Sequence, residues 1–174
     1  MSARPLSRLT LVLGGARSGK SNYAERLVVS APAPWLYLAT AQAIDDEMQA
    51  RIAEHKGRRD ARWRTVEVPL DLAEALAALG EKPQAVLIDC LTLWLSNTLL
   101  AKRNLAVAGD RLIAALTAAR GPVVVVSNEV GLGIVPDTPL GREFRDAQGQ
   151  LNQRVAAIAD HVVFLAAGLP LTLK

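Results

Sequence analysis

The stretch GGARSGKS, at residues 14–21, constrains what this chain can fold into more than any other feature. It matches the pattern G-x-x-x-x-G-K-[ST], follows the apolar run RLTLVLGG and opens a run of helical character, SGKSNYAERLVVSA. In that setting the pattern predicts a strand, a tight loop and a helix. A glycine-rich turn that arose by chance is the alternative, and the complete motif in its required context argues against it.

The residues of this loop suit the binding of phosphates. Gly14 and Gly19 allow the backbone to turn and to approach a ligand closely, while amide N–H groups and the helix N-terminus supply positive potential. Lys20 is placed for the β- and γ-phosphates of a nucleotide, and Ser21 is placed for Mg²⁺. The predicted nucleotide-binding loop comprises Gly14, Gly15, Ala16, Arg17, Ser18, Gly19, Lys20 and Ser21.

Apolar runs typical of strands alternate with helical runs along the chain. We expect strands at 8–15, 34–40, 63–69, 84–91 and 122–131, and helices at 18–31, 45–59, 71–80, 109–121 and 141–160. This alternation predicts an α/β fold with a mainly parallel sheet and helices on both faces, in a single domain over 1–174. The last runs, HVVFLAAG and LPLTLK, predict a strand and its hairpin partner, and therefore an antiparallel edge near the C-terminus.

The composition fits this class of protein. Hydrophobic residues make up 51% of the chain and aromatic residues only 4%, so the core must consist mostly of aliphatic side chains, as in a buried parallel sheet. A net charge of +3 fits a polyanionic small molecule as well as nucleic acid. No run is long and apolar enough to span a membrane, and MSARPLSR lacks an adjoining signal core. The single cysteine, Cys90, fits a core position in a reducing compartment, so we expect a cytoplasmic protein.

Polar residues follow two of the predicted strands. Asp89 ends the run AVLID and fits the carboxylate that holds Mg²⁺ directly or through water; an ordinary strand-end or N-cap aspartate is the alternative. Ser127, Asn128 and Glu129 follow VVVV. Ligands of open α/β sheets bind at such strand ends, but a simple transition from strand to loop explains these three residues equally well.

The stretch EHKGRRDARWRT, at 54–65, holds one of the chain's two histidines among four arginines and one lysine. Nearby positive charge favours the neutral, nucleophilic imidazole of His55, and the arginines could hold a triphosphate against it. From the residues alone, a solvated basic helix end with an incidental histidine is the stronger explanation. The other histidine, His161, has no such neighbours, and we expect it to be structural.

Several motifs together resemble one known enzyme family. GGARSGKS, YLATAQ, DDEMQARIAEHKGRR, LIDCLTLWLSN, SNEVGLGIVP and GREFRDAQGQLNQRVAAIAD occur in an order similar to that of the adenosylcobinamide kinase/adenosylcobinamide-phosphate guanylyltransferase family of cobalamin biosynthesis. The resemblance runs from about Leu11 to Lys174. The phosphate loop alone is shared by many families. His55-Lys56 followed by Arg59 and Trp63, together with SNEVGLGIVP, is much more specific.

The resemblance implies a RecA-like P-loop NTPase fold, a homotrimer, and two reactions that use Mg²⁺ with ATP or GTP. The first phosphorylates the aminopropanol hydroxyl of adenosylcobinamide. In the second, GTP gives GMP to a histidine with release of pyrophosphate, and the phosphorylated cobinamide then takes the GMP. The family pattern matches that histidine to His55, which with Lys20 forms the expected catalytic pair. Further implied nucleotide-binding residues are Ala39, Thr40, Ala41, Lys56, Gly57, Arg58, Arg59, Glu67 and Asp89, with Ser21 and Asp89 at the metal.

Two residues depart from the family pattern. Asp60 stands where proline is usual, and we expect it to loosen the loop and to weaken its attraction for phosphate. Asp89 stands where some members carry Glu, so we expect a water to bridge it to Mg²⁺.

Two other functions fit parts of the sequence. A small-molecule P-loop kinase would use the phosphate loop and leave His55 idle. A RecA-like ATPase dependent on nucleic acid would place the basic cluster on phosphate backbones, but the chain lacks a basic tail and has few aromatic side chains for stacking. We therefore expect small-molecule partners, namely adenosylcobinamide, ATP and GTP, and no nucleic acid.

Overall fold

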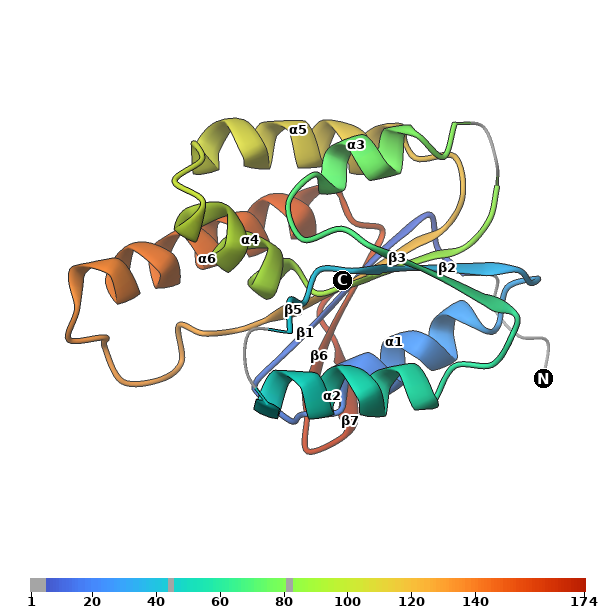
Figure 1. The fold of residues 1–174 in the computed structure, drawn as a ribbon, viewed down its shortest axis with the longest axis horizontal. Helices are drawn as coiled ribbons and strands as arrows, with labels where there is room; N and C mark the ends of the chain where they lie inside the picture. Colours follow the sequence, from blue (N-terminus) through green and yellow to red (C-terminus); the bar gives the residue numbers. More distant parts are fainter. Residues whose placement is uncertain (1–5, 44–45, 81–82) are drawn as a thin grey trace.

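A computed structural model describes residues 6–43, 46–80 and 83–174 and shows a chain built around a seven-stranded sheet (Figure 1). The strand order is β3-β2-β4-β5-β1-β6-β7. The strands are β1 (Leu9–Gly14), β2 (Trp35–Ala39), β3 (Trp63–Glu67), β4 (Val86–Asp89), β5 (Val123–Asn128), β6 (His161–Ala166) and β7 (Leu169–Thr172). Every neighbouring pair is parallel except β6 and β7, which are antiparallel.

Helices cover both faces of this sheet. They are α1 (Lys20–Val28), α2 (Asp46–Gly57), α3 (Leu72–Ala77), α4 (Leu91–Leu100), α5 (Leu105–Ala118) and α6 (Pro139–Ile158). In Figure 1, α1 and α2 lie below the sheet and the other four helices lie above it. None of the helices in the described ranges is long and apolar enough to cross a membrane.

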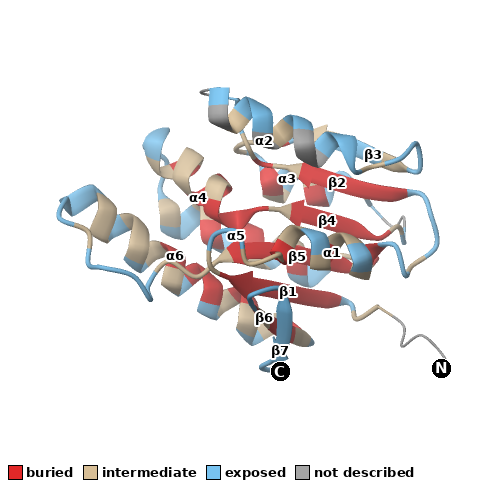
Figure 2. Ribbon diagram, turned by 90° about the horizontal axis from the view of Figure 1, so that it is seen from below, coloured by how far each residue is buried: buried red, intermediate tan, exposed pale blue. Residues whose placement is uncertain are grey.

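The central strands are buried on both sides, as Figure 2 shows. Side chains alternate between the two layers of core, because successive residues of a strand point to opposite faces. Leu11 and Leu13 of β1 pack into the cluster that includes Leu112 of α5 and Leu151 of α6, whereas Val12 packs into the cluster on the α1 side. Four consecutive valines in β5 are at most 1% exposed, which accounts for the uninterrupted apolar run.

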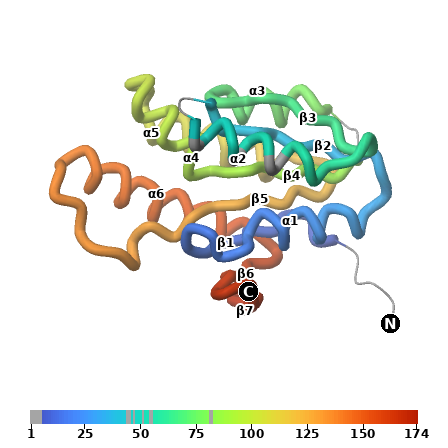
Figure 3. The backbone as a smooth tube through the Cα atoms, turned by 60° about the horizontal axis from the view of Figure 1, so that its bottom comes forward, coloured from blue at the N-terminus to red at the C-terminus, as the bar shows by residue number. Residues whose placement is uncertain are grey.

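The parallel order brings the carboxyl ends of several strands to one edge of the sheet. Gly14 at the end of β1 is in register with Asn128 of β5, and Asp89 of β4 is in register with Ala39 of β2 and Val126 of β5. The tube in Figure 3 shows the same arrangement, with β1 leading into the loop before α1. Segments far apart in the sequence therefore meet at this edge.

The predicted fold class is confirmed, including the parallel sheet between two helical layers and the antiparallel edge, where Val163 pairs with Thr172. The run at 92–103, which the sequence pattern left unassigned, lies largely in α4. The helix expected from residue 109 begins earlier, at Leu105, because the Asn104 side chain caps it by accepting from Val107 N at 3.1 Å.

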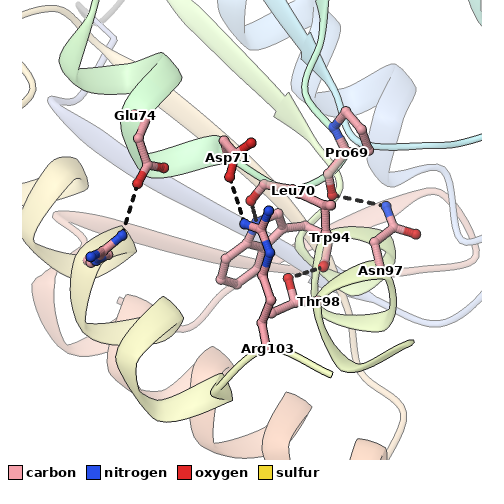
Figure 4. A network of polar contacts seen from close by, with 9 residues as sticks. Pro69, Leu70, Asp71, Glu74, Trp94, Asn97, Thr98 and Arg103 are labelled. Carbon is pink, nitrogen blue, oxygen red and sulfur yellow. Dashed lines mark hydrogen bonds and ion pairs between the residues drawn. The ribbon is translucent and has the colours of Figure 1, made fainter. Parts of the chain in front are cut away.

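Asp71, the first residue of the helix predicted at 71–80, occupies the N-cap position of α3 but does not cap the helix with its side chain. Instead its Oδ1 accepts a hydrogen bond from Arg103 Nη1 at 2.6 Å (Figure 4). The helix ends at Ala77, three residues before the end of the predicted range 71–80. The ion pair with a residue distant in sequence is a tertiary contact, which a local capping pattern cannot reveal.

Candidate active site

The phosphate loop leaves the sheet at the end of β1, where β1 passes close to β6. A Cβ atom at Gly14 would lie 2.5 Å from the carbonyl oxygen of Leu165, and Gly14 has a φ of 151°, so a larger residue would force a shift. The loop ends at Gly19, whose φ of 93° is left-handed, and α1 begins at Lys20. Both glycines of the motif therefore occupy positions where the backbone conformation or a close contact requires glycine.

Lys20 lies within this loop and is only 7% exposed although it carries a charge. Its Nζ donates to the carbonyl oxygen of Gly15 and, at 3.5 Å, to Oγ of Ser18. The loop backbone thus wraps around the ammonium group and fixes it at the N-terminus of α1. A fixed positive centre beside a helix N-terminus is suited to a phosphate group.

The turn between β6 and β7 braces the loop from outside. Gly168 N donates to the carbonyl oxygen of Ser18 at 3.0 Å, and a Cβ at Gly19 would lie 3.4 Å from Gly168 Cα. Ala167 and Gly168 both have left-handed φ angles, 51° and 79°, as a tight two-residue hairpin turn requires. The sequence suggested the hairpin but not its contact with the loop.

A cavity of about 680 Å³ opens between the phosphate loop, the ends of β2 and β4, and helix α2. It is lined by thirteen of the predicted nucleotide-binding residues: Ala16, Arg17, Ser18, Gly19, Lys20, Ser21, Ala39, Ala41, Lys56, Arg58, Arg59, Glu67 and Asp89. The predicted residues Gly14, Gly15, Thr40 and Gly57 are not among its lining residues. The structure therefore brings the phosphate loop and the basic end of α2 to a single cavity.

Thr40 is fully buried and does not face the cavity; its side chain bonds the backbone of Cys90, behind the residues that line the cavity. Its Oγ1 donates to the carbonyl oxygen of Cys90 at 2.7 Å and accepts from Cys90 N at 2.8 Å. Asn97 Nδ2 of α4 donates to the carbonyl oxygens of Thr40, at 2.8 Å, and Pro69, at 3.0 Å; the bond to Pro69 is drawn in Figure 4. These bonds fix the ends of β2, β3 and β4 relative to one another.

Cys90 is buried, as the sequence predicted. Burial raises the pKa of the Cys90 thiol to about 11, with a smaller contribution from the charge of Asp89. The thiol is therefore neutral near pH 7, which fits a packing role and not that of a nucleophile.

Asp89 ends β4, lines the cavity and is joined to an aromatic side chain that the sequence analysis had not singled out. Its Oδ2 accepts a hydrogen bond from the Tyr37 hydroxyl at 3.0 Å. Burial, and then the nearby charge of Asp89, raises the pKa of Tyr37, so this hydroxyl remains a donor. The guanidinium of Arg59 lies 3.6 Å from the centre of the Tyr37 ring, in cation–π contact. Tyr37 thereby connects the carboxylate of β4 with an arginine that follows α2.

The oxygen donors at the cavity fit Mg²⁺. Ser21 and Asp89 both line the cavity, and they offer a hydroxyl and a carboxylate. Within the described ranges, no three or more His, Cys, Asp or Glu residues gather as a metal cage. Mg²⁺ needs no such cage, because it characteristically binds one or two protein oxygens together with substrate phosphates and water.

The basic end of α2 is tied to the elements on either side of it. His55 belongs to this helix, but its side chain lies outside what the structure describes. Lys56 Nζ lies 3.1 Å from Oε1 of Glu67 in β3, and Arg58 donates a hydrogen bond to the Asn22 side chain of α1. These contacts place the predicted residues Lys56, Arg58 and Glu67 around the same end of the cavity.

Asp60, in the position where the family pattern usually has proline, takes part in a tight turn. Its Oδ1 accepts from Arg62 N at 2.9 Å, its Oδ2 accepts from Arg62 Nη2 at 2.6 Å, and its carbonyl oxygen accepts from Trp63 N at 3.1 Å. The hydrogen bonds from Arg62 lower the pKa of Asp60. Side-chain hydrogen bonds therefore hold this turn at the position where the family pattern has a proline ring.

The polar residues at the end of β5 have two different roles: one is structural and the other lines the cavity. Ser127 is fully buried; its Oγ donates to Asn152 Oδ1 at 2.7 Å and accepts from Gln148 Nε2 at 2.9 Å, so its role is structural. Asn128 lines the cavity. His161 begins β6, and its Nδ1 lies 2.9 Å from the carbonyl oxygen of Lys174, a position in agreement with the expected structural role.

The glycine-rich loop between β1 and α1, the parallel strand order and the cavity at the strand ends define a P-loop NTPase fold. The fold is similar to that of a solved RadB recombinase, with a TM-score of 0.55 and 16% sequence identity, over 91% of this chain and 75% of that one. At this identity the likeness concerns the fold alone. It confirms the RecA-like P-loop fold that the motifs implied.

The sequence as a whole defines the family more narrowly. The chain belongs to the cobinamide kinase/cobinamide phosphate guanyltransferase family, whose sequence model matches residues 10–173. It is 49% identical over 166 residues to the bifunctional adenosylcobalamin biosynthesis protein CobP of Pseudomonas aeruginosa, covering 94% of this chain and 96% of that protein. It is 42% identical over 181 residues to the bifunctional protein CobU of Salmonella typhimurium, covering 95% of this chain and 99% of that protein. The family resemblance seen in the motifs is confirmed.

We predict that Asp89→Asn raises the Mg²⁺ concentration needed for half-maximal kinase activity at least about fivefold, because an anionic oxygen is lost at the metal. Asparagine keeps an acceptor for the Tyr37 hydroxyl, so the fold should survive. The measurement is a Mg²⁺ titration of initial rates at saturating nucleotide. Asp110→Asn, which affects an exposed pair with Arg154, is the control and should leave the titration unchanged. An unchanged titration for Asp89→Asn would make Asp89 an ordinary strand-end residue.

Proposed function

We propose that this protein phosphorylates adenosylcobinamide with ATP or GTP and then transfers GMP from GTP to the product, giving adenosylcobinamide-GDP. Membership of the cobinamide kinase/guanyltransferase family supports both activities. The observation that carries the proposal is one cavity lined both by the phosphate loop and by the basic end of α2. We propose further that both reactions take place in this cavity, with the loop as the common phosphate-binding element.

In the kinase step, the hydroxyl oxygen of adenosylcobinamide attacks the γ-phosphorus of the nucleotide. The bond from that phosphorus to the β,γ-bridging oxygen breaks, the nucleoside diphosphate leaves, and the hydroxyl proton passes to solvent. Lys20 and the loop N–H groups would stabilise the charge that develops on the phosphoryl oxygens. Mg²⁺, held by Ser21 and Asp89, would neutralise the β- and γ-phosphates.

In the transferase step, an imidazole nitrogen of His55 attacks the α-phosphorus of GTP and pyrophosphate leaves. A phosphate oxygen of adenosylcobinamide phosphate then attacks the same phosphorus, the P–N bond breaks, and His55 is restored. Covalent catalysis of this kind divides one displacement into two easier ones. Lys56, Arg58 and Arg59 line the cavity near this helix end and would neutralise the nucleotide phosphates.

Of the chain's two histidines, His55 is the better candidate for the nucleophile that takes GMP. His161 starts β6 and contacts the Lys174 carbonyl, away from the residues that line the cavity. His55 lies in α2, whose residues Met48, Ile52 and Lys56 all line the cavity. A kinase in which His55 is idle remains the alternative, and the variant experiment below separates the two.

We also propose that the protein is a homotrimer. Apolar side chains are exposed in the loop between β5 and α6, where Leu132 is 81% and Ile134 is 98% exposed, and along β7, where Leu169 and Leu171 are 72% and 60% exposed. Exposed apolar clusters of this kind are typical of surfaces covered by another chain. Sedimentation equilibrium should give about three times the 18.6 kDa mass of the chain; a purely monomeric mass at micromolar concentration would contradict the proposal.

We predict that Lys20→Ala lowers the kinase rate at least about a hundredfold, because a charge aimed at the developing phosphoryl charge is lost. The readout is phosphorylation of adenosylcobinamide by labelled nucleotide, with circular dichroism to show that the variant is folded. Lys102→Ala, an exposed lysine between α4 and α5, should retain the wild-type rate. A Lys20→Ala rate close to that of the wild type would refute the role of the loop.

We predict that His55→Ala abolishes the covalent GMP adduct and the transferase activity while retaining kinase activity, because phosphoryl transfer requires no imidazole nucleophile. Mass spectrometry after incubation with GTP and Mg²⁺ should find one GMP per wild-type chain, on the peptide that contains His55.

His161→Ala is the matched control and should retain the adduct. Two results would contradict the histidine assignment: an adduct of full yield on His55→Ala, or a wild-type adduct that maps to the adjacent Lys56.

A further inference from the structure

Two buried side-chain atoms, one on α1 and one just after α2, have no hydrogen-bond partner. They are Oε1 of Glu25, in the middle of α1, and Nη1 of Arg59, just after α2. Among the described residues, the third such side-chain atom is Oε1 of Gln148, in the separate network of Ser127. Buried polar groups in native proteins are almost always paired, so two orphans of opposite charge at one helix junction require an explanation.

The two atoms are chemically complementary. Glu25 offers a carboxylate acceptor, and Arg59 offers a guanidinium donor. Burial raises the pKa of Glu25, while the charges of Arg58 and Arg59 act in the opposite direction and that of Asp89 adds to the rise. Both arginines are therefore within electrostatic reach of this carboxyl group.

Both arginines also contact residues of neighbouring elements. The Arg59 guanidinium lies 3.6 Å from the centre of the Tyr37 ring, whose hydroxyl donates to Asp89 at 3.0 Å. Arg58 donates to Asn22, which lies three residues before Glu25 on α1 and so on nearly the same helix face. Asn22 and Glu25 therefore lie on one face of α1, and Asn22 accepts a hydrogen bond from Arg58 there.

Glu25 differs from these neighbours in its access to the cavity. Arg58, Arg59, Asn22 and Tyr37 line the cavity, whereas Glu25 is not among the lining residues. A ligand in the cavity would therefore touch Arg59 but not Glu25, and any influence of Glu25 on that ligand must pass through the arginine.

We propose that Glu25 is a positioning residue, whose buried carboxylate attracts the Arg59 guanidinium through space and so favours the place of this guanidinium against the Tyr37 ring at the end of α2. The proposal rests on the proposed function, because it takes the cavity to hold the phosphates of a nucleotide. A prepositioned arginine loses less side-chain freedom when a phosphate binds, so the nucleotide binds more tightly. The role requires the charge of Glu25 and not merely its shape.

The test is a double-mutant cycle of Glu25→Gln and Arg59→Ala in the full chain. The measured quantity is the Kd for a GTP analogue whose α,β-bond cannot be hydrolysed, determined by calorimetry in the presence of Mg²⁺. Glu25→Gln should weaken binding about five- to tenfold in the wild-type background and less than about twofold in the Arg59→Ala background, since interacting residues are non-additive. A merely structural role of Glu25 would weaken binding equally in both backgrounds. Equal weakening, or no weakening in the wild-type background, would overturn the proposal.

Glu74→Gln is the matched control, because Glu74 is an exposed carboxylate that pairs with Arg111 at 3.3 Å on the opposite helical layer (Figure 4). It should leave the Kd unchanged, and thermal unfolding should show that all variants are folded. If wild-type protein failed to bind the analogue, the proposed function would fail, and the positioning role of Glu25 with it. Normal wild-type binding with an additive cycle would overturn the positioning role alone.

Discussion

The site depends on the close approach of β1 and β6 at Gly14. A side chain there would meet the carbonyl oxygen of Leu165 at 2.5 Å, so only glycine lets the two strands pair up to the point where the loop begins. From that point the loop curls around the Lys20 ammonium group and delivers the chain into α1. The β6–β7 turn, through Gly168, holds the outside of the loop in place. The phosphate loop is thus a product of the sheet packing and not an independent module.

The parts of this protein that could be predicted from the sequence are those encoded by local patterns. Apolar runs predicted the buried strands, and the spacing of GGARSGKS predicted where β1 ends and α1 begins. The family resemblance brought Arg58, Arg59 and Glu67 into the predicted site, and all three line the cavity. Local pattern was enough here because strand burial, glycine conformation and motif order are properties of short segments.

The parts that could not be predicted depend on side chains that meet across the fold. Tyr37 looked like one more residue of an apolar strand. Its ring is nevertheless in cation–π contact with Arg59, and its hydroxyl donates a hydrogen bond to Asp89. Thr40 lies in the predicted site, and its hydroxyl bonds the backbone of Cys90. Glu25 looked like an ordinary helix carboxylate, and only packing reveals that one of its oxygens is buried without a hydrogen-bond partner. The surroundings of each of these residues are formed by segments that are distant in the sequence.

We propose that one cavity serves both reactions. GTP with a methylene group between the α- and β-phosphorus tests it directly, since such an analogue can still donate its γ-phosphoryl group but cannot give GMP to a histidine. The measurement is the rate of GMP-adduct formation against GTP concentration at several fixed concentrations of this analogue. If the two reactions share this cavity, the analogue inhibits competitively with GTP, and its inhibition constant equals the analogue concentration that half-saturates phosphoryl transfer. Adduct formation that continues unchanged when the analogue saturates the kinase reaction would show that the two reactions use separate sites.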